Sequence, residues 1–111
     1  MNTRPQDRLI METGASVAIP WYENEKSYAA VRDLHPAAER QNPISYDAFR
    51  AKMEHLEQKL KRDGTIPLRI PIEAIPLKRW CDANNLAICR KSVTTYIGLC
   101  LARRLRRAGD N

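Results

Sequence analysis

The sequence has few of the residues that mark specialised classes of protein. Only seven of its 111 residues are aromatic (two Trp, four Tyr and one Phe), so the core is expected to be mostly aliphatic. Three cysteines cannot all pair within one chain, and no CxxC spacing occurs. The four glycines are scattered and form no phosphate-cradling loop. A disulfide framework, a zinc cluster and a nucleotide-binding loop therefore have no signature in this chain.

Long apolar runs are also missing. The longest uncharged stretch of interest, 93–102, has about half the length that a helix needs to cross a bilayer. The first twenty residues are interrupted by charge and contain no secretory core. We therefore expect a cytoplasmic protein with no membrane partner, whose cysteines are small core residues. The expected organisation is a mobile N-terminus at 1–14, one compact domain at 15–108 and a tail at 109–111.

The positive charge is concentrated in the second part of the chain. The net charge is +6, and residues 41–111 hold fourteen of the nineteen basic residues but only seven of the thirteen acidic ones. A basic end of this kind attracts nucleic acid, an acidic protein or an anionic surface. The alternative is that basic side chains near a helix C-terminus only complement the helix dipole.

Hydrophobic periodicity predicts four helices in a mostly α-helical chain. Ser45 is a suitable N-cap for the second of them, and Gly64 suits the left-handed residue that ends it. Asn85 suits the same role after the third helix, whose Pro76 is tolerated because it falls in the first turn. The predicted helices cover 23–34, 45–64, 74–85 and 89–107.

The stretch 65–72, "TIPLRIPI", alternates strictly and predicts a β-strand. Pro67 and Pro71 remove two backbone donors from the same edge of this strand, which must therefore be an edge strand with one neighbour. That neighbour is either the short predicted strand at 15–19 or the same strand of a second molecule. In the second case the dimer interface is predicted at Ile66, Leu68, Ile70 and Ile72.

These elements predict an α+β fold, mostly α, with about four helices and one edge strand. The stretches "PWYENEKSYAAVRDL", "ISYDAF" and "LKRDG", followed by "LKRWCDANNL" and a basic final helix, resemble a group of small bacterial proteins, mostly from proteobacteria, with no established activity. The pair Trp80 and Cys81 is the most specific element of this resemblance. Leu77 departs from the pattern, where an aromatic is expected, and so does the longer N-terminus. The resemblance implies a compact α-rich domain and assigns no catalytic residue.

The histidines, cysteines and acids give little sign of catalysis or metal binding. His35 and His55 lack the i, i+4 pairing of a zinc-binding helix. Cys89, beside Arg90 and near a helix start, is the best candidate for an activated thiol, but an unreactive structural cysteine is the favoured alternative. We therefore expect neither an enzyme nor a cofactor. The acids interpreted as ordinary surface or helix-start residues are Glu54, Glu57 and Glu73.

Two aromatic positions leave alternatives open. Trp80 offers a ring on which a nucleic-acid base stacks, but it shares a helix face with Leu77 and Cys81, so core packing is favoured. Trp21 and Tyr22 are predicted either to anchor a partner from an exposed position or to cover the core as a lid. The sequence does not choose between these two roles.

The last predicted helix has an apolar face centred on Val93 and Ile97. Arg104 falls on that face, so we expect packing to end near Leu101 unless Arg104 extends past the core or meets an acid on another chain. The last turns then form a basic stub, a geometry that disfavours sequence-specific reading of DNA. The residues predicted to contact phosphates or an acidic partner are Arg90, Lys91, Arg103, Arg104, Arg106 and Arg107.

Small size and the single usable strand edge favour a non-enzymatic interaction or assembly module, expected to be a homodimer. The alternative is an accessory nucleic-acid-binding protein that uses the basic final helix for non-specific phosphate contacts. The partners predicted from the sequence are therefore a second copy, an acidic protein or nucleic acid.

Overall fold

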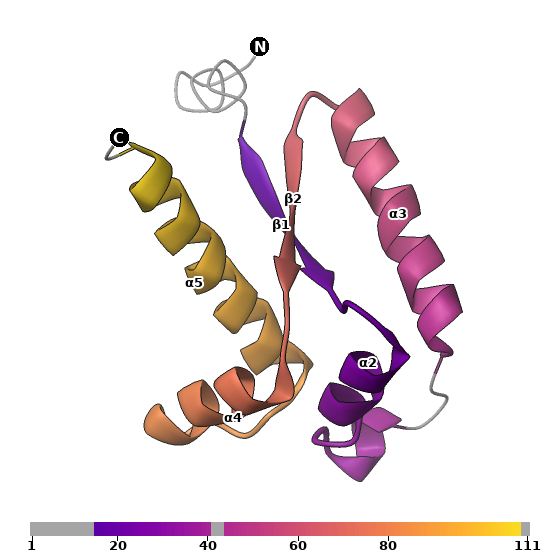
Figure 1. The fold of residues 1–111 in the computed structure, drawn as a ribbon, viewed down its shortest axis with the longest axis vertical. Coiled ribbons are helices and arrows are strands. Elements are labelled where there is room, and N and C mark those ends of the chain that lie inside the picture. The colour runs from indigo at the N-terminus through magenta and orange to yellow at the C-terminus, as the bar shows by residue number, and fades with distance from the viewer. Residues whose placement is uncertain (1–14, 41–43, 110–111) are drawn as a thin grey trace.

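The structure is a computed structural model, which describes residues 15–40 and 44–109. Two parallel strands lie between two long helices, and two shorter helices close one end (Figure 1). This confirms the predicted α+β, mostly α fold. The mobile N-terminus predicted at 1–14 lies outside the described residues, and so does the tail predicted at 109–111 except for its first residue, which ends the last helix. The elements in chain order are β1 (Ser16–Trp21), α2 (Glu25–Arg32), the 3-10 helix η1 (Ala37–Arg40), α3 (Tyr46–Arg62), β2 (Ile66–Pro71), α4 (Ala74–Ala83) and α5 (Arg90–Gly109).

β1 is the neighbour of β2. The two strands pair in parallel, from Ser16 opposite Ile66 to Trp21 opposite Pro71. At the two ends of the pair, the Ile66 amide donates to the Ala15 carbonyl and the Ile72 amide to the Trp21 carbonyl, each over 2.9 Å. The even-numbered edge of β2 therefore faces β1, so a second molecule cannot pair with that edge while β1 occupies it.

The outer edges of the sheet carry the prolines. Even-numbered residues of β2 direct their backbone groups to β1, so Pro67 and Pro71 fall on the opposite, outer edge. The carbonyl of Arg69 points to this same edge, where Nη1 of Arg104 donates to it over 3.2 Å. On β1, Pro20 takes an outer-edge position, because the odd-numbered residues of that strand face β2. Each outer edge thus has fewer donors than an ordinary strand.

One face of the sheet packs against α5. Ile70 is 2% exposed and lies with Ile72, Val93 and Ile97 in the main apolar cluster. Ile66, at the start of the same strand, is 45% exposed. Of the four residues predicted to form a dimer interface, Ile70 and Ile72 are thus core residues of a single chain, Leu68 is half-buried and Ile66 faces solvent.

The other face packs against α3 through a charged pair. Glu57 is only 8% exposed, which corrects its interpretation as an ordinary surface acid. Its two carboxylate oxygens accept from Nε and Nη2 of Arg69 over 2.7 and 2.9 Å. The same guanidinium lies 3.7 Å from the centroid of the Trp21 ring. The hydrophobic pattern of the sequence did not predict this pair, because it indicates only which apolar residues are buried and not which charged residues of different elements meet.

The helix ends follow the predicted capping residues. The Ala48 amide donates to the Ser45 hydroxyl over 3.0 Å, as expected for an N-cap. Gly64 and Asn85 have positive φ angles of 87° and 55°, so both take the left-handed conformation expected just beyond a helix. Pro76 lies in the first turn of α4, where its missing amide costs no helical hydrogen bond.

Strand β2 offers a matched test of its buried and exposed residues. Replacing Ile70 by Ala should lower the free energy of unfolding by about 2–4 kcal/mol, because it leaves a cavity between β2 and α5. The same change at Ile66 should cost less than about 1 kcal/mol. Urea unfolding followed by circular dichroism measures both, and equal losses would contradict the assignment of the two faces.

The pair of Glu57 and Arg69 offers a second test. Replacing Arg69 by Met should lower the free energy of unfolding by about 1–3 kcal/mol at pH 7, because a mostly buried carboxylate loses two charge-assisted hydrogen bonds. Arg50→Met is the control, since Arg50 lies farther from the Trp21 ring, at 5.4 Å, and pairs with Glu54 at the surface. The control should cost less than about 0.5 kcal/mol.

The same pair predicts a pH dependence. Hydrogen bonds from Arg69 lower the pKa of Glu57 in the folded state. The resulting stabilisation is therefore complete above the ordinary Glu pKa of about 4.3 and is lost as the pH falls through the lowered folded-state value. Urea midpoints measured on both proteins should fall more steeply with acidification in the parent than in Arg69→Met. Parallel curves would contradict the assignment.

Candidate functional site

The six basic residues predicted to contact phosphates are all exposed, but they do not form one surface. Arg90 and Lys91 lie at the first turn of α5, and the four arginines lie near its end. From Arg90 to Arg103 the helical rise alone gives a separation of about 20 Å. A small ligand can therefore contact one end of α5 or the other, but not both.

The C-terminal end of α5 follows the predicted arrangement. Leu101 is half-buried, and all residues from Arg103 to Ala108 are exposed. Arg104 is the foreseen exception to the end of packing, because its side chain reaches past the core to the Arg69 carbonyl. Arg104 is therefore hydrogen-bonded within the fold although it is exposed. Arg103, Arg106 and Arg107 are exposed as well.

The N-terminal end of α5 is capped by protein groups. The Arg90 amide donates to Oε1 of Glu39 over 2.8 Å, which ties η1 to this helix. The Cys89 amide donates to the Ser92 hydroxyl over 2.9 Å. Hydrogen bonds from the amide and hydroxyl of Ser92 lower the pKa of Cys89, and the Glu39 carboxylate opposes the shift. The surroundings of Cys89 therefore favour its thiolate form relative to an isolated thiol.

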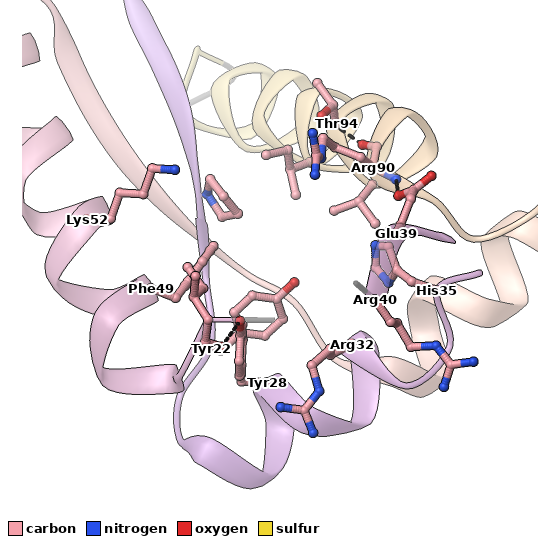
Figure 2. A pocket seen from close by; sticks show the side chains of 14 residues that line it. Tyr22, Tyr28, Arg32, His35, Glu39, Arg40, Phe49, Lys52, Arg90 and Thr94 are labelled. Carbon is pink, nitrogen blue, oxygen red and sulfur yellow. Dashed lines mark hydrogen bonds between the residues drawn. The ribbon is translucent and has the colours of Figure 1, made fainter. Parts of the chain in front are cut away.

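A cleft opens between α2, α3 and α5, and we call it the aromatic cleft (Figure 2). It has a volume of about 370 Å³ and is lined by Tyr22, Tyr28 and Phe49. The ring of Tyr22 lies 5.4 Å from each of the other two rings, between centroids. The Tyr46 hydroxyl donates to the Tyr22 carbonyl over 2.8 Å and fixes the backbone there.

The positions of Tyr22 and Trp21 favour the lid over the exposed anchor. Tyr22 is buried, and this burial raises its pKa to about 12, so its hydroxyl keeps its proton at neutral pH. Trp21 is half-buried under the guanidinium of Arg69. Both side chains therefore belong to the packing around the sheet, and Tyr22 also forms part of the cleft wall.

Basic side chains surround the aromatic cleft. Figure 2 shows Lys52 of α3 and Arg90 of α5 on opposite sides of the hollow, with Arg32 of α2 and Arg40 of η1 farther round its rim. Glu39 is the one acid among the lining residues, and its carboxylate already accepts from the Arg90 amide. The lining of the cleft therefore carries a net positive charge. Its residues come from elements that are far apart in the sequence.

A second hollow, the α4–α5 groove, lies between the last two helices and has a volume of about 310 Å³. Trp80 and Tyr96 line it, with ring centroids 5.5 Å apart and both side chains half-buried. Leu99 lines it and is 47% exposed. Arg79 and Arg103 also line it, and its lining contains no acid.

Residues 15–40 and 44–109 contain no group of three or more His, Cys, Asp or Glu that could hold a metal ion. Within the same ranges no helix is both long and apolar enough to span a bilayer.

Compared with protein-family models, curated proteins and solved structures, the chain matches none of them. No residue role is therefore carried over from another protein, and the two hollows are assigned from their own geometry.

The sequence contained a signal for part of the aromatic cleft. Arg32 follows Tyr28 by four residues, and Lys52 follows Phe49 by three, so each base shares a helix face with an aromatic. Nothing in the sequence placed these two pairs beside each other, because they approach only when α2 and α3 fold around the sheet. Leu99 had no such signal, because it falls on the polar side of α5.

The thiols of Cys89 and Cys81 should differ in their reactivity toward an alkylating reagent. Iodoacetamide at neutral pH should modify Cys89 well before Cys81, because Cys89 is accessible with a lowered pKa and Cys81 is fully buried. Mass spectrometry of peptides sampled over time identifies the modified site, and Cys89→Ser should remove the fast phase. Equal rates at the two cysteines would contradict the placement of Cys89.

Proposed function

We propose that the protein is a non-enzymatic, cytoplasmic interaction module, and that it binds an acidic, amphipathic segment of another protein in the α4–α5 groove. The observation that carries the choice of partner is an apolar groove whose lining includes two arginines. The cytoplasmic location is supported by the three cysteines of the protein, which are free thiols, as expected in a reducing compartment.

The apolar part of the proposed surface is unusually exposed. Leu99 lines the groove, and Ile75 of α4, next to the lining residue Pro76, is 68% exposed. Covering each of these side chains contributes about 1–2 kcal/mol to binding. Trp80 adds a flat ring to the lining, the type of side chain that dominates protein interfaces. The groove therefore suits apolar anchors spaced along one side of a helix.

The charged part of the surface selects the partner. Arg79 and Arg103 line the groove, and the chain as a whole carries a net charge of +6. Carboxylates beside the apolar anchors would meet these two guanidinium groups, and long-range attraction would speed the encounter. A second copy brings the same positive charge, so self-association at this groove is opposed by repulsion.

Leu99 and Leu105 make a matched pair for testing the groove. The probe is a fluorescein-labelled helical peptide with Glu on one face and Leu and Phe on the other, compared with a scrambled peptide of the same composition. Leu99→Ser should weaken binding about tenfold, because it removes an apolar contact. Leu105→Ser should leave affinity unchanged, since Leu105 is 44% exposed on the same helix but does not line the groove.

Fluorescence anisotropy measures these affinities, and light scattering gives the native mass of each variant. Equal binding of the scrambled peptide, or equal effects of the two serine variants, would overturn the acidic-segment proposal. A dimer that dissociates on Leu99→Ser would overturn it in favour of a second copy as the occupant.

Nucleic-acid binding is the second candidate, favoured by the exposed arginines at the end of α5. It predicts that a short DNA duplex binds at low salt, that affinity falls steeply as salt rises, and that Arg106→Met and Arg107→Met each reduce the slope. Absence of binding at low salt, or salt-independent binding, would count against this candidate.

A further inference from the structure

We infer that the aromatic cleft is a binding site for a small molecule that combines a flat ring with a phosphate group. This site is separate from the α4–α5 groove. It contacts α5 through Arg90, Val93 and Ile97, whereas the groove uses Tyr96, Leu99 and Arg103. At about 100° per residue these two sets lie on different flanks of the helix, so one site can be occupied while the other is empty.

The walls of the cleft suit a ring. Phe49 is half-buried and lines the cleft beside Tyr22 and Tyr28, whose rings pack edge to face and hold the wall rigid. Aromatic walls bind planar groups through stacking and edge contacts at low entropic cost. The volume of about 370 Å³ falls in the range of small-molecule sites, and it holds a ring with one substituent.

The wall also offers a hydrogen-bond donor. Among the described residues, the Tyr22 hydroxyl has no hydrogen-bond partner, while the Tyr28 hydroxyl donates to the Ile44 carbonyl over 2.8 Å. Because burial raises the pKa of Tyr22 to about 12, this hydroxyl is available as a donor at neutral pH. A polar atom on the ring of the ligand would satisfy it.

The rim suits a phosphate. Lys52 and Arg90 are exposed side chains without a salt bridge in the described part of the chain, and they lie on opposite sides of the hollow (Figure 2). Arg40 also lines the cleft, but Figure 2 shows its guanidinium directed away from the hollow. Guanidinium groups match phosphate oxygens in geometry, and two cations together favour a dianion over a single carboxylate. The ring then occupies the aromatic wall while the phosphate remains at the mouth.

Two ring-bearing phosphates test this inference by isothermal titration calorimetry at low salt. The probes are 5′-AMP and phenyl phosphate, and the comparisons are their halves, adenosine, phenol and inorganic phosphate. At least one ring-bearing phosphate should bind at a single saturable site, and about tenfold or more tighter than either half presented alone, because ring and phosphate contacts add. Inorganic phosphate that binds as tightly as both probes, or absence of binding by both, would overturn the inference.

A pair of double variants separates the cleft from general charge. Lys52→Met with Arg90→Met should weaken the bound probe about tenfold or more, because two charged contacts are lost. Lys61→Met with Arg106→Met removes the same charge from exposed positions on the same two helices, outside the cleft lining, and should change the affinity less than about twofold. Equal losses in both double variants would overturn the inference. The result is independent of peptide binding at the groove, which neither the Lys52 nor the Arg90 change touches.

Discussion

Arg69 joins four elements of this fold through one side chain and one carbonyl. Its guanidinium binds both oxygens of Glu57 on α3 and lies against the ring of Trp21 on β1, while its carbonyl accepts from Arg104 on α5. A parallel strand pair is stable only when both of its faces are covered. Arg69 therefore contacts both covering helices, α3 through its side chain and α5 through its backbone carbonyl.

The packing of α5 on the sheet also determines where the two hollows lie. α5 contacts the sheet with its Val93 and Ile97 face, which leaves two flanks free. One flank contacts η1 and faces α2 and α3, and the other flank contacts α4 (Figure 1). Each flank borders a hollow whose lining includes aromatic and basic residues. The same helix therefore forms a wall of both hollows.

The sequence predicted the local structure well, for physical reasons that are themselves local. Alternation fixed which residues of β2 share a face, and the missing donors of Pro67 and Pro71 identified its outer edge. Gly64 and Asn85 ended their helices because few other residues tolerate a positive φ. Glu57 and the rim of the aromatic cleft were beyond such reasoning, since their environments are made by side chains from other elements. The choice between β1 and a second molecule as strand partner likewise needed the three-dimensional arrangement.

The prolines at the outer edges have a consequence for the chain before and after it folds. A two-stranded sheet exposes a larger share of its backbone than a wide one, and open edges recruit strands from neighbouring molecules. Pro67 and Pro71 on one side, and Pro20 on the other, interrupt the regular ladder that cross-β stacking requires. The apolar segment "IPLRIPI" would otherwise combine high β-propensity with few charges. Its prolines act as gatekeepers, which let the chain keep a short hydrophobic sheet without making it a seed for aggregation.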